Sequence, residues 1–100
     1  MGTSYKAAAF LIESRMLDAV RGDADALYDL GVAYSTGANG IDIDLIEAHK
    51  WFNLAALNGS RSGQESRAEI ADEMSAREIA EAQRQARAWL ASTTCRQAAA

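Results

Sequence analysis

The sequence contains no proline, and its 100 residues include only one cysteine and one histidine. Without proline, only the seven glycines oppose long helices. One cysteine excludes an internal disulfide framework, and one histidine leaves no second imidazole with which to build a metal site. β-Branched and aromatic residues are too few and scattered for a sheet. These absences favour a single all-α domain, and the 49% of apolar residues can supply its core.

Two further absences concern function. The net charge is −4 and both signs are interleaved, so the chain has no basic stripe of the kind that binds nucleic acid. No segment approaches the ~20 apolar residues that span a bilayer, and the apolar run at residues 7–12 is shorter than that of a secretory signal. We therefore expect a cytoplasmic protein that binds neither nucleic acid nor a membrane.

Helical spacing of apolar residues predicts five helices, bounded by glycines and by capping residues. They are expected at about residues 5–21, 24–36, 44–58, 60–74 and 75–92. Asp23 is the expected N-cap of the second helix, while Asp44 with Glu47 and Ser75 with Glu78 form capping boxes for the third and the fifth. Residues 93–100 carry no pattern, so a flexible tail is expected there.

The core is expected around the third helix, which is apolar on two sides and therefore needs neighbours on both. Its Trp51 and Phe52, with Tyr28 and Tyr34 of the second helix, are interpreted as packing residues and not as a ligand cage. Gly31 lies inside the second helix at a cost of ~1 kcal/mol relative to alanine. We therefore expect Gly31 to let a neighbouring helix approach closely.

An offset of about 37 residues superposes Gly22 on Gly59, and such a period is typical of helical solenoids. The domain at residues 1–92 then divides into a half repeat at 4–22, a full repeat at 23–59 and a degenerate capping repeat at 60–92. Each hairpin buries its apolar face against the next one. The predicted fold is a short right-handed α–α superhelix of about five antiparallel helices.

One motif within this period covers about a third of the chain. It consists of Ala26, Tyr28, Leu30, Gly31, Tyr34, Gly37, Gly40, Ile41, Asp44, Ala48, Trp51, Phe52, Ala55, Ala56 and Gly59. In this spacing the motif resembles a Sel-one-like repeat (SLR), of the tetratricopeptide-like superfamily. Residues 74–82 are similar to the closing helix of short bacterial members. The resemblance implies an adaptor that assembles protein complexes in signalling or protein quality control, with no catalytic residue and no cofactor.

Two surfaces are candidates for binding. The first is the concave side of the second helix, with the non-consensus positions Asp25, Asp29, Val32, Ser35 and Thr36. The second is the line of Phe10 and Leu17 on the first helix. Because that helix lacks its hairpin partner, the line is a candidate for a two-fold homodimer.

No catalytic or metal site is predicted. His49, the single histidine, is interpreted as structural because catalysis needs a partner acid or base within reach. Asp42, Asp44 and Glu47 lack the spacing of a calcium loop, and helix capping explains Asp44 and Glu47.

The sequence therefore predicts a non-enzymatic adaptor that binds a protein or a peptide. One alternative is an enzyme or enzyme accessory for a small cell-wall or β-lactam-like ligand, since some cysteine-rich relatives are linked to β-lactams. This chain lacks their paired cysteines. The other alternative is a self-associating regulatory protein. An enzyme needs a pocket with convergent titratable groups, and this requirement separates it from an adaptor.

Overall fold

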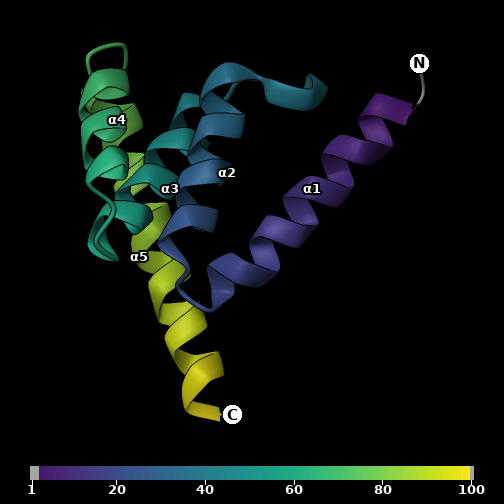
Figure 1. Ribbon diagram of the computed structural model, residues 1–100. Coiled ribbons are helices and arrows are strands. Elements are labelled where there is room, and N and C mark those ends of the chain that lie inside the picture. Colours follow the sequence, from purple (N-terminus) through teal and green to yellow (C-terminus); the bar gives the residue numbers. More distant parts are fainter. Residues whose placement is uncertain (1–2, 100) are drawn as a thin grey trace.

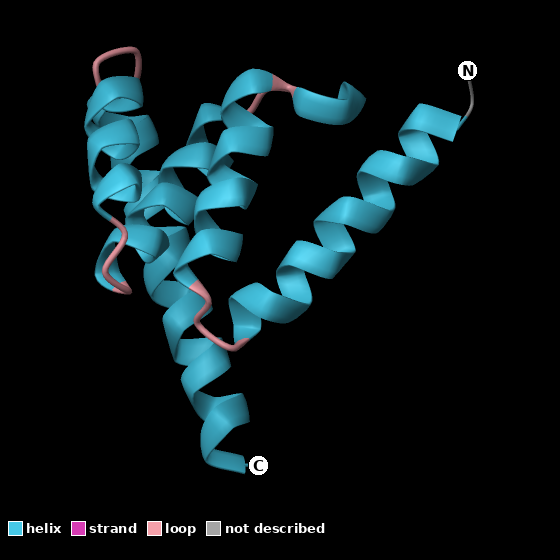
Figure 2. Cartoon of the chain, in the orientation of Figure 1, coloured by secondary structure: helices cyan, strands magenta, loops and turns pink. Residues whose placement is uncertain are grey.

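The computed structural model describes the backbone of residues 3–99 and the side chains of residues 11–38 and 40–93. Its helices are α1 (Thr3–Val20), α2 (Ala24–Thr36), α3 (Leu45–Leu57), α4 (Arg61–Ala71) and α5 (Ala76–Ala99), with a short 3₁₀ helix, η1 (Ala38–Gly40), after α2 (Figure 1). No strand occurs in residues 3–99 (Figure 2). The all-α prediction is confirmed. No helix of this part of the chain combines the length and the apolar character needed to cross a membrane.

The turns that follow α1 and α3 have the same backbone geometry. After α1, Gly22 N donates to Ala19 O at 2.9 Å, and after α3, Gly59 N donates to Ala56 O at 3.0 Å. Both glycines have a positive φ, 81° and 96°, which glycine adopts without steric strain. The two turns therefore end their helices in the same way, at the offset of about 37 residues found in the sequence.

The helices that follow these turns also begin alike. The Asp23 carboxylate accepts a hydrogen bond from Ala26 N at 3.2 Å, and the Ser60 hydroxyl accepts one from Gly63 N at 2.9 Å. These bonds satisfy N–H groups that the first turn of a helix leaves without a partner. The predicted N-cap at Asp23 is confirmed, and Ser60 is the N-cap of α4.

α3 is the central helix, because α2, α4 and α5 all pack against it. Trp51 and Phe52 of α3 are 1% and 2% exposed. A Cβ atom on Gly31 would lie 2.4 Å from the ring of Phe52, which is closer than real Cβ atoms come. The glycine therefore permits the close approach of α2 to α3, as predicted.

α5 packs on α3 and has only slight contact with α4 within residues 3–99. The rings of Trp51 and Trp89 meet edge to face, with centroids 4.9 Å apart. α4 is polar, and its buried residue is Gly63, which lies tightly against the backbone of α3. Because α4 offers little apolar surface, α5 packs on the central helix, and the last two helices do not form a close hairpin.

Two predicted helix ends differ from the structure. α4 ends at Ala71 and not near Met74. The next helix starts from the capping box, in which Glu78 N donates to the Ser75 hydroxyl at 3.1 Å and Ser75 N donates to the Glu78 carboxylate at 2.8 Å. α5 does not end near Ser92 but continues to Ala99.

A flexible tail was predicted from Thr93 onward, but Thr93 is helical and 6% exposed. Its hydroxyl donates to Trp89 O at 3.0 Å, so its polar group is satisfied within α5. The alanines, arginine and glutamine that follow are strong helix formers, and no glycine or proline stops the helix. Ala100 lies outside the described residues.

Candidate functional site

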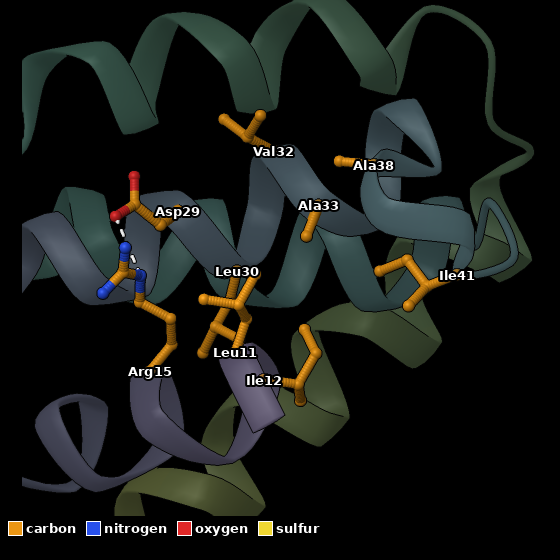
Figure 3. Close-up of a pocket in the computed structure, with 9 residues that line it drawn as sticks. All are labelled: Leu11, Ile12, Arg15, Asp29, Leu30, Val32, Ala33, Ala38 and Ile41. Carbon is orange, nitrogen blue, oxygen red and sulfur yellow. Dashed lines mark ion pairs between the residues drawn. The ribbon is translucent and has the colours of Figure 1, made fainter. Parts of the chain in front are cut away.

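A groove of about 230 Å³ opens between α1 and α2 and is bounded at one end by η1 (Figure 3). Its apolar lining consists of Leu11 and Ile12 from α1, Leu30, Val32 and Ala33 from α2, and Ala38 and Ile41 from η1 and the residues after it. The charged side chains of the lining are Arg15 and Asp29. The groove therefore combines an apolar floor with one pair of opposite charges.

The groove exists because α1 diverges from α2 (Figure 1). Near the turn, α1 is anchored by Ala19, which is 2% exposed, and by Met16, which packs against the core. Farther from the turn the two helices separate, and Leu11 is left 38% exposed. Ile12 still packs against the core, whereas Leu11 and Arg15 line the open side of the groove.

One ion pair crosses between the helices. Arg15 Nε lies 3.2 Å from Asp29 Oδ2, and the two side chains are 43% and 50% exposed (Figure 3). A pair this exposed contributes at most about 1 kcal/mol to stability. Its charges remain accessible to water, and hence to charged groups of a bound molecule.

The size of the groove limits what it can hold. An engineered apolar cavity of about 150 Å³ in another protein binds benzene, so 230 Å³ accommodates one large apolar side chain. Sites for drug-sized molecules are usually about 300–1,000 Å³. The groove is thus better matched to an anchoring side chain of a protein than to a small ligand.

The structure brings together two of the five residues predicted on the second helix. Asp29 and Val32 line the groove. Asp25 is exposed in the first turn of α2, outside the lining. The hydroxyls of Ser35 and Thr36 donate to Val32 O at 3.2 and 2.8 Å, so both satisfy a backbone carbonyl near the C-terminus of α2.

On α1, Leu17 is 69% exposed, whereas the side chain of Phe10 lies outside the described residues. Leu11, Arg15 and Ile41 also line the groove and were not predicted as binding residues. The apolar run at residues 7–12 was the available signal for Leu11. Nothing in the spacing of Arg15 and Ile41 indicates that they lie near α2.

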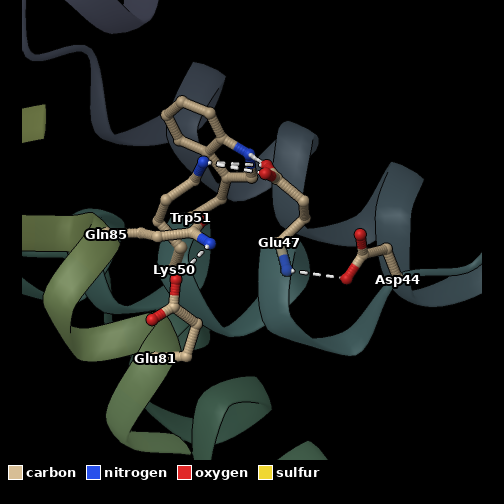
Figure 4. A network of polar contacts seen from close by, with 6 residues as sticks. All are labelled: Asp44, Glu47, Lys50, Trp51, Glu81 and Gln85. Carbon is tan, nitrogen blue, oxygen red and sulfur yellow. Dashed lines mark hydrogen bonds and ion pairs between the residues drawn. The ribbon is translucent and has the colours of Figure 1, made fainter. Parts of the chain in front are cut away.

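The carboxylates of Asp44 and Glu47 make polar contacts within α3 and at its N-terminus (Figure 4). Asp44 accepts from Glu47 N at 3.1 Å, as predicted for an N-cap. The Glu47 carboxylate accepts a hydrogen bond from Trp51 Nε1 at 3.0 Å and pairs with Lys50 Nζ at 2.9 Å. It therefore does not accept the hydrogen bond from Asp44 N that would complete a capping box. Among the described residues, no group of three or more His, Cys, Asp or Glu side chains is placed to hold a metal ion.

His49 is 3% exposed in α3, and its Nδ1 has no hydrogen-bond partner among the described residues. Burial lowers the pKa of this imidazole below its ordinary value of 6.5, and the positive charge of Arg67 lowers the pKa further. The charged form of His49 is therefore less favourable in the folded protein than in the unfolded chain.

This lowered pKa predicts a loss of stability in mild acid. The unfolded chain binds a proton near pH 6.5 and the folded chain only at lower pH, so the free energy of unfolding falls as the pH drops below 6.5. The fall is at most about 1.4 kcal/mol per pH unit and stops below the folded pKa. Urea unfolding at pH 7.5 and 5.5 measures it, with His49→Gln as the control. Equal pH dependence in both proteins would contradict the prediction.

Comparison with known proteins places no family on this fold. No protein-family model matches the chain, and searches of curated proteins and of solved structures found no match.

Proposed function

We propose that this protein is a non-enzymatic adaptor of the SLR type that holds a protein partner in the groove between α1 and α2. The observation that carries the proposal is the groove itself, which has the size of one large side chain, an apolar floor and a charged pair at Arg15 and Asp29. Protein interfaces concentrate their binding energy in such apolar pockets with polar rims. An enzyme, or an accessory for a small ligand, is less well supported, because the titratable side chains that line the groove, Arg15 and Asp29, are paired with each other.

The proposed α–α superhelix has structural support in two places. The turns after α1 and α3, and the caps that follow them, have matching hydrogen bonds at the same offset. In addition, α4 contacts α2 and α5 contacts α3, so each of these helices packs on the helix two places before it. Stacked helical hairpins have contacts of this kind between alternate helices, although α4 and α5 do not form a close hairpin within residues 3–99.

Capture of the partner tests the function. Tagged wild-type protein, Val32→Glu and Thr36→Glu are expressed in the native cells, and the bound proteins are quantified. Val32→Glu places a charge in the apolar groove and is expected to reduce recovery at least about tenfold, since a lost anchor contributes about 2 kcal/mol. Thr36→Glu, outside the lining of the groove, is expected to retain the partner. Equal recovery with both variants would show that the groove is not the binding site.

We also propose two-fold self-association through the outer side of α1, which the 69% exposure of Leu17 favours. Light scattering is expected to give about twice the 10.7 kDa chain mass for the wild type and one chain for Leu17→Glu. Leu57→Glu is the matched control, since Leu57 is 62% exposed on another helix. A monomeric wild type, or a mass that Leu17→Glu leaves unchanged, would count against the dimer.

A further inference from the structure

We infer that the groove receives the apolar face of a basic amphipathic helix from a protein partner. The inference rests on the proposed function and states the chemistry of its partner. It depends on two independent observations. The first is that other helices cover the part of α3 equivalent to the groove wall, and the second is the net charge of the chain segment that contains the groove lining.

The first observation indicates that a helix fits. On α3, Ala48 and Phe52 are 0% and 2% exposed, and α2 lies against Phe52 through Gly31. At the offset of about 37 residues, their equivalents on α1 are Leu11 and Arg15, which line the groove and are 38% and 43% exposed. Within residues 3–99, α1 packs mainly on α2 and η1, and no helix takes the place that α2 takes on α3 (Figure 1).

The second observation is charge. Residues 11–44, which contain the whole lining of the groove, carry seven carboxylates and two arginines, a net charge of −5. Residues 45–93 carry seven carboxylates and six basic side chains, a net charge of −1. The seven carboxylates of the first segment are Glu13, Asp18, Asp23, Asp25, Asp29, Asp42 and Asp44. A field of this sign attracts a basic partner and repels an acidic one.

Together the two observations describe a helix with an apolar stripe and basic flanks. Helices that bind in grooves use apolar anchors at positions i, i+3 or i+4, and i+7. The apolar anchor enters between Leu11 and Val32, where the groove has room for one large side chain. Lysines or arginines beside the stripe then meet Asp29 and Asp25, which are both exposed on α2.

Two synthetic peptides of ~18 residues, long enough to form helix, test this inference. Both carry the same leucine stripe, and the polar face is lysine in one and glutamate in the other. Binding is measured by the anisotropy of a fluorescent label on the peptide. The lysine peptide is expected to bind wild-type protein at least about tenfold more tightly than the glutamate peptide, and its affinity is expected to fall with added salt.

Neutral substitutions locate the site without changing the charge. Leu11→Gln is expected to weaken binding of the lysine peptide at least about fivefold, whereas Leu57→Gln, the same exchange at an exposed leucine outside the groove, is expected to leave it within twofold. Asp29→Asn is expected to weaken the lysine peptide and not the glutamate peptide. Circular dichroism confirms that each variant is folded.

Equal binding of the two peptides, no binding of the lysine peptide, or equal effects of Leu11→Gln and Leu57→Gln would overturn the inference. A wild-type dimer that Leu11→Gln dissociates would also overturn it, because a second copy would then occupy the groove. If the lysine peptide fails while Val32→Glu still abolishes capture of a cellular protein, the proposed function stands and only the helical, basic partner is wrong. If the peptide binds in the groove but no cellular protein depends on Val32, the proposed function fails instead.

Discussion

Gly31→Ala is expected to lower the free energy of unfolding by about 2 kcal/mol, although alanine is normally the better helix former by about 1 kcal/mol. The reason is that the new Cβ would lie 2.4 Å from the ring of Phe52. Phe52 is 2% exposed and packs against Tyr28, with ring centroids 5.4 Å apart, so its ring has little room to move. α2 and α3 must then separate, which loosens the core contacts between them.

Thermal unfolding followed by circular dichroism measures this effect, and a fall in Tm of roughly 10 °C is expected for a domain of this size. Phe52→Leu provides the control, because a smaller side chain restores space for the new methyl group. The double variant is therefore expected to lose less stability than the two single variants added together. A Gly31→Ala protein as stable as the wild type would show that α2 and α3 are not held at this distance.

Trp51→Ala is expected to have the largest effect, a loss of about 3–5 kcal/mol. Trp51 is 1% exposed, packs edge to face on Trp89, and donates to the Glu47 carboxylate at 3.0 Å. Removing the indole leaves a cavity between α3 and α5, and the Glu47 carboxylate loses a hydrogen-bond donor. A domain of 100 residues has a free energy of unfolding at the low end of the usual 5–15 kcal/mol, about 5 kcal/mol, so a loss of this size is expected to bring the variant close to its unfolding midpoint at 37 °C.

Urea unfolding at 25 °C gives the size of the loss. Trp51→Phe keeps an aromatic ring but not the N–H donor, and is expected to cost less than Trp51→Ala. Leu57→Ala, at a residue that is 62% exposed on the same helix, is expected to change stability by no more than about 0.5 kcal/mol. If Trp51→Ala and Leu57→Ala behave alike, α3 is not the centre of the core.

Local features of the fold could be predicted where one residue determines the local geometry. Asp23 and Asp44 cap their helices as predicted, because a cap depends on a side chain and on an N–H two or three residues later. Gly31 could be interpreted for a similar reason, since a glycine inside a helix implies a close neighbour. The end of α5 was missed because weak periodicity after Ser92 does not stop a helix of strong helix formers.

The groove depends on geometry that no local pattern encodes. Leu11, Asp29 and Ile41 come from three elements, and the angle at which α1 leaves the turn brings them together. Asp29 and Val32 were predicted as binding residues because they lie outside the repeat consensus. That criterion identified the α2 wall of the groove but not the α1 wall. The close hairpin predicted at residues 60–92 does not form, because α4 offers little apolar surface and α5 packs on α3 instead.

The most direct test of the groove is site-specific photo-crosslinking in the native cells. A benzoylphenylalanine replaces Leu11 in the groove in one protein and the exposed Leu57 in a matched control, and crosslinked products are separated by mass. If the groove holds the partner, the Leu11 probe gives a discrete crosslinked protein and the Leu57 probe does not. A product from Leu57 alone, or the same products from both positions, would contradict binding in the groove.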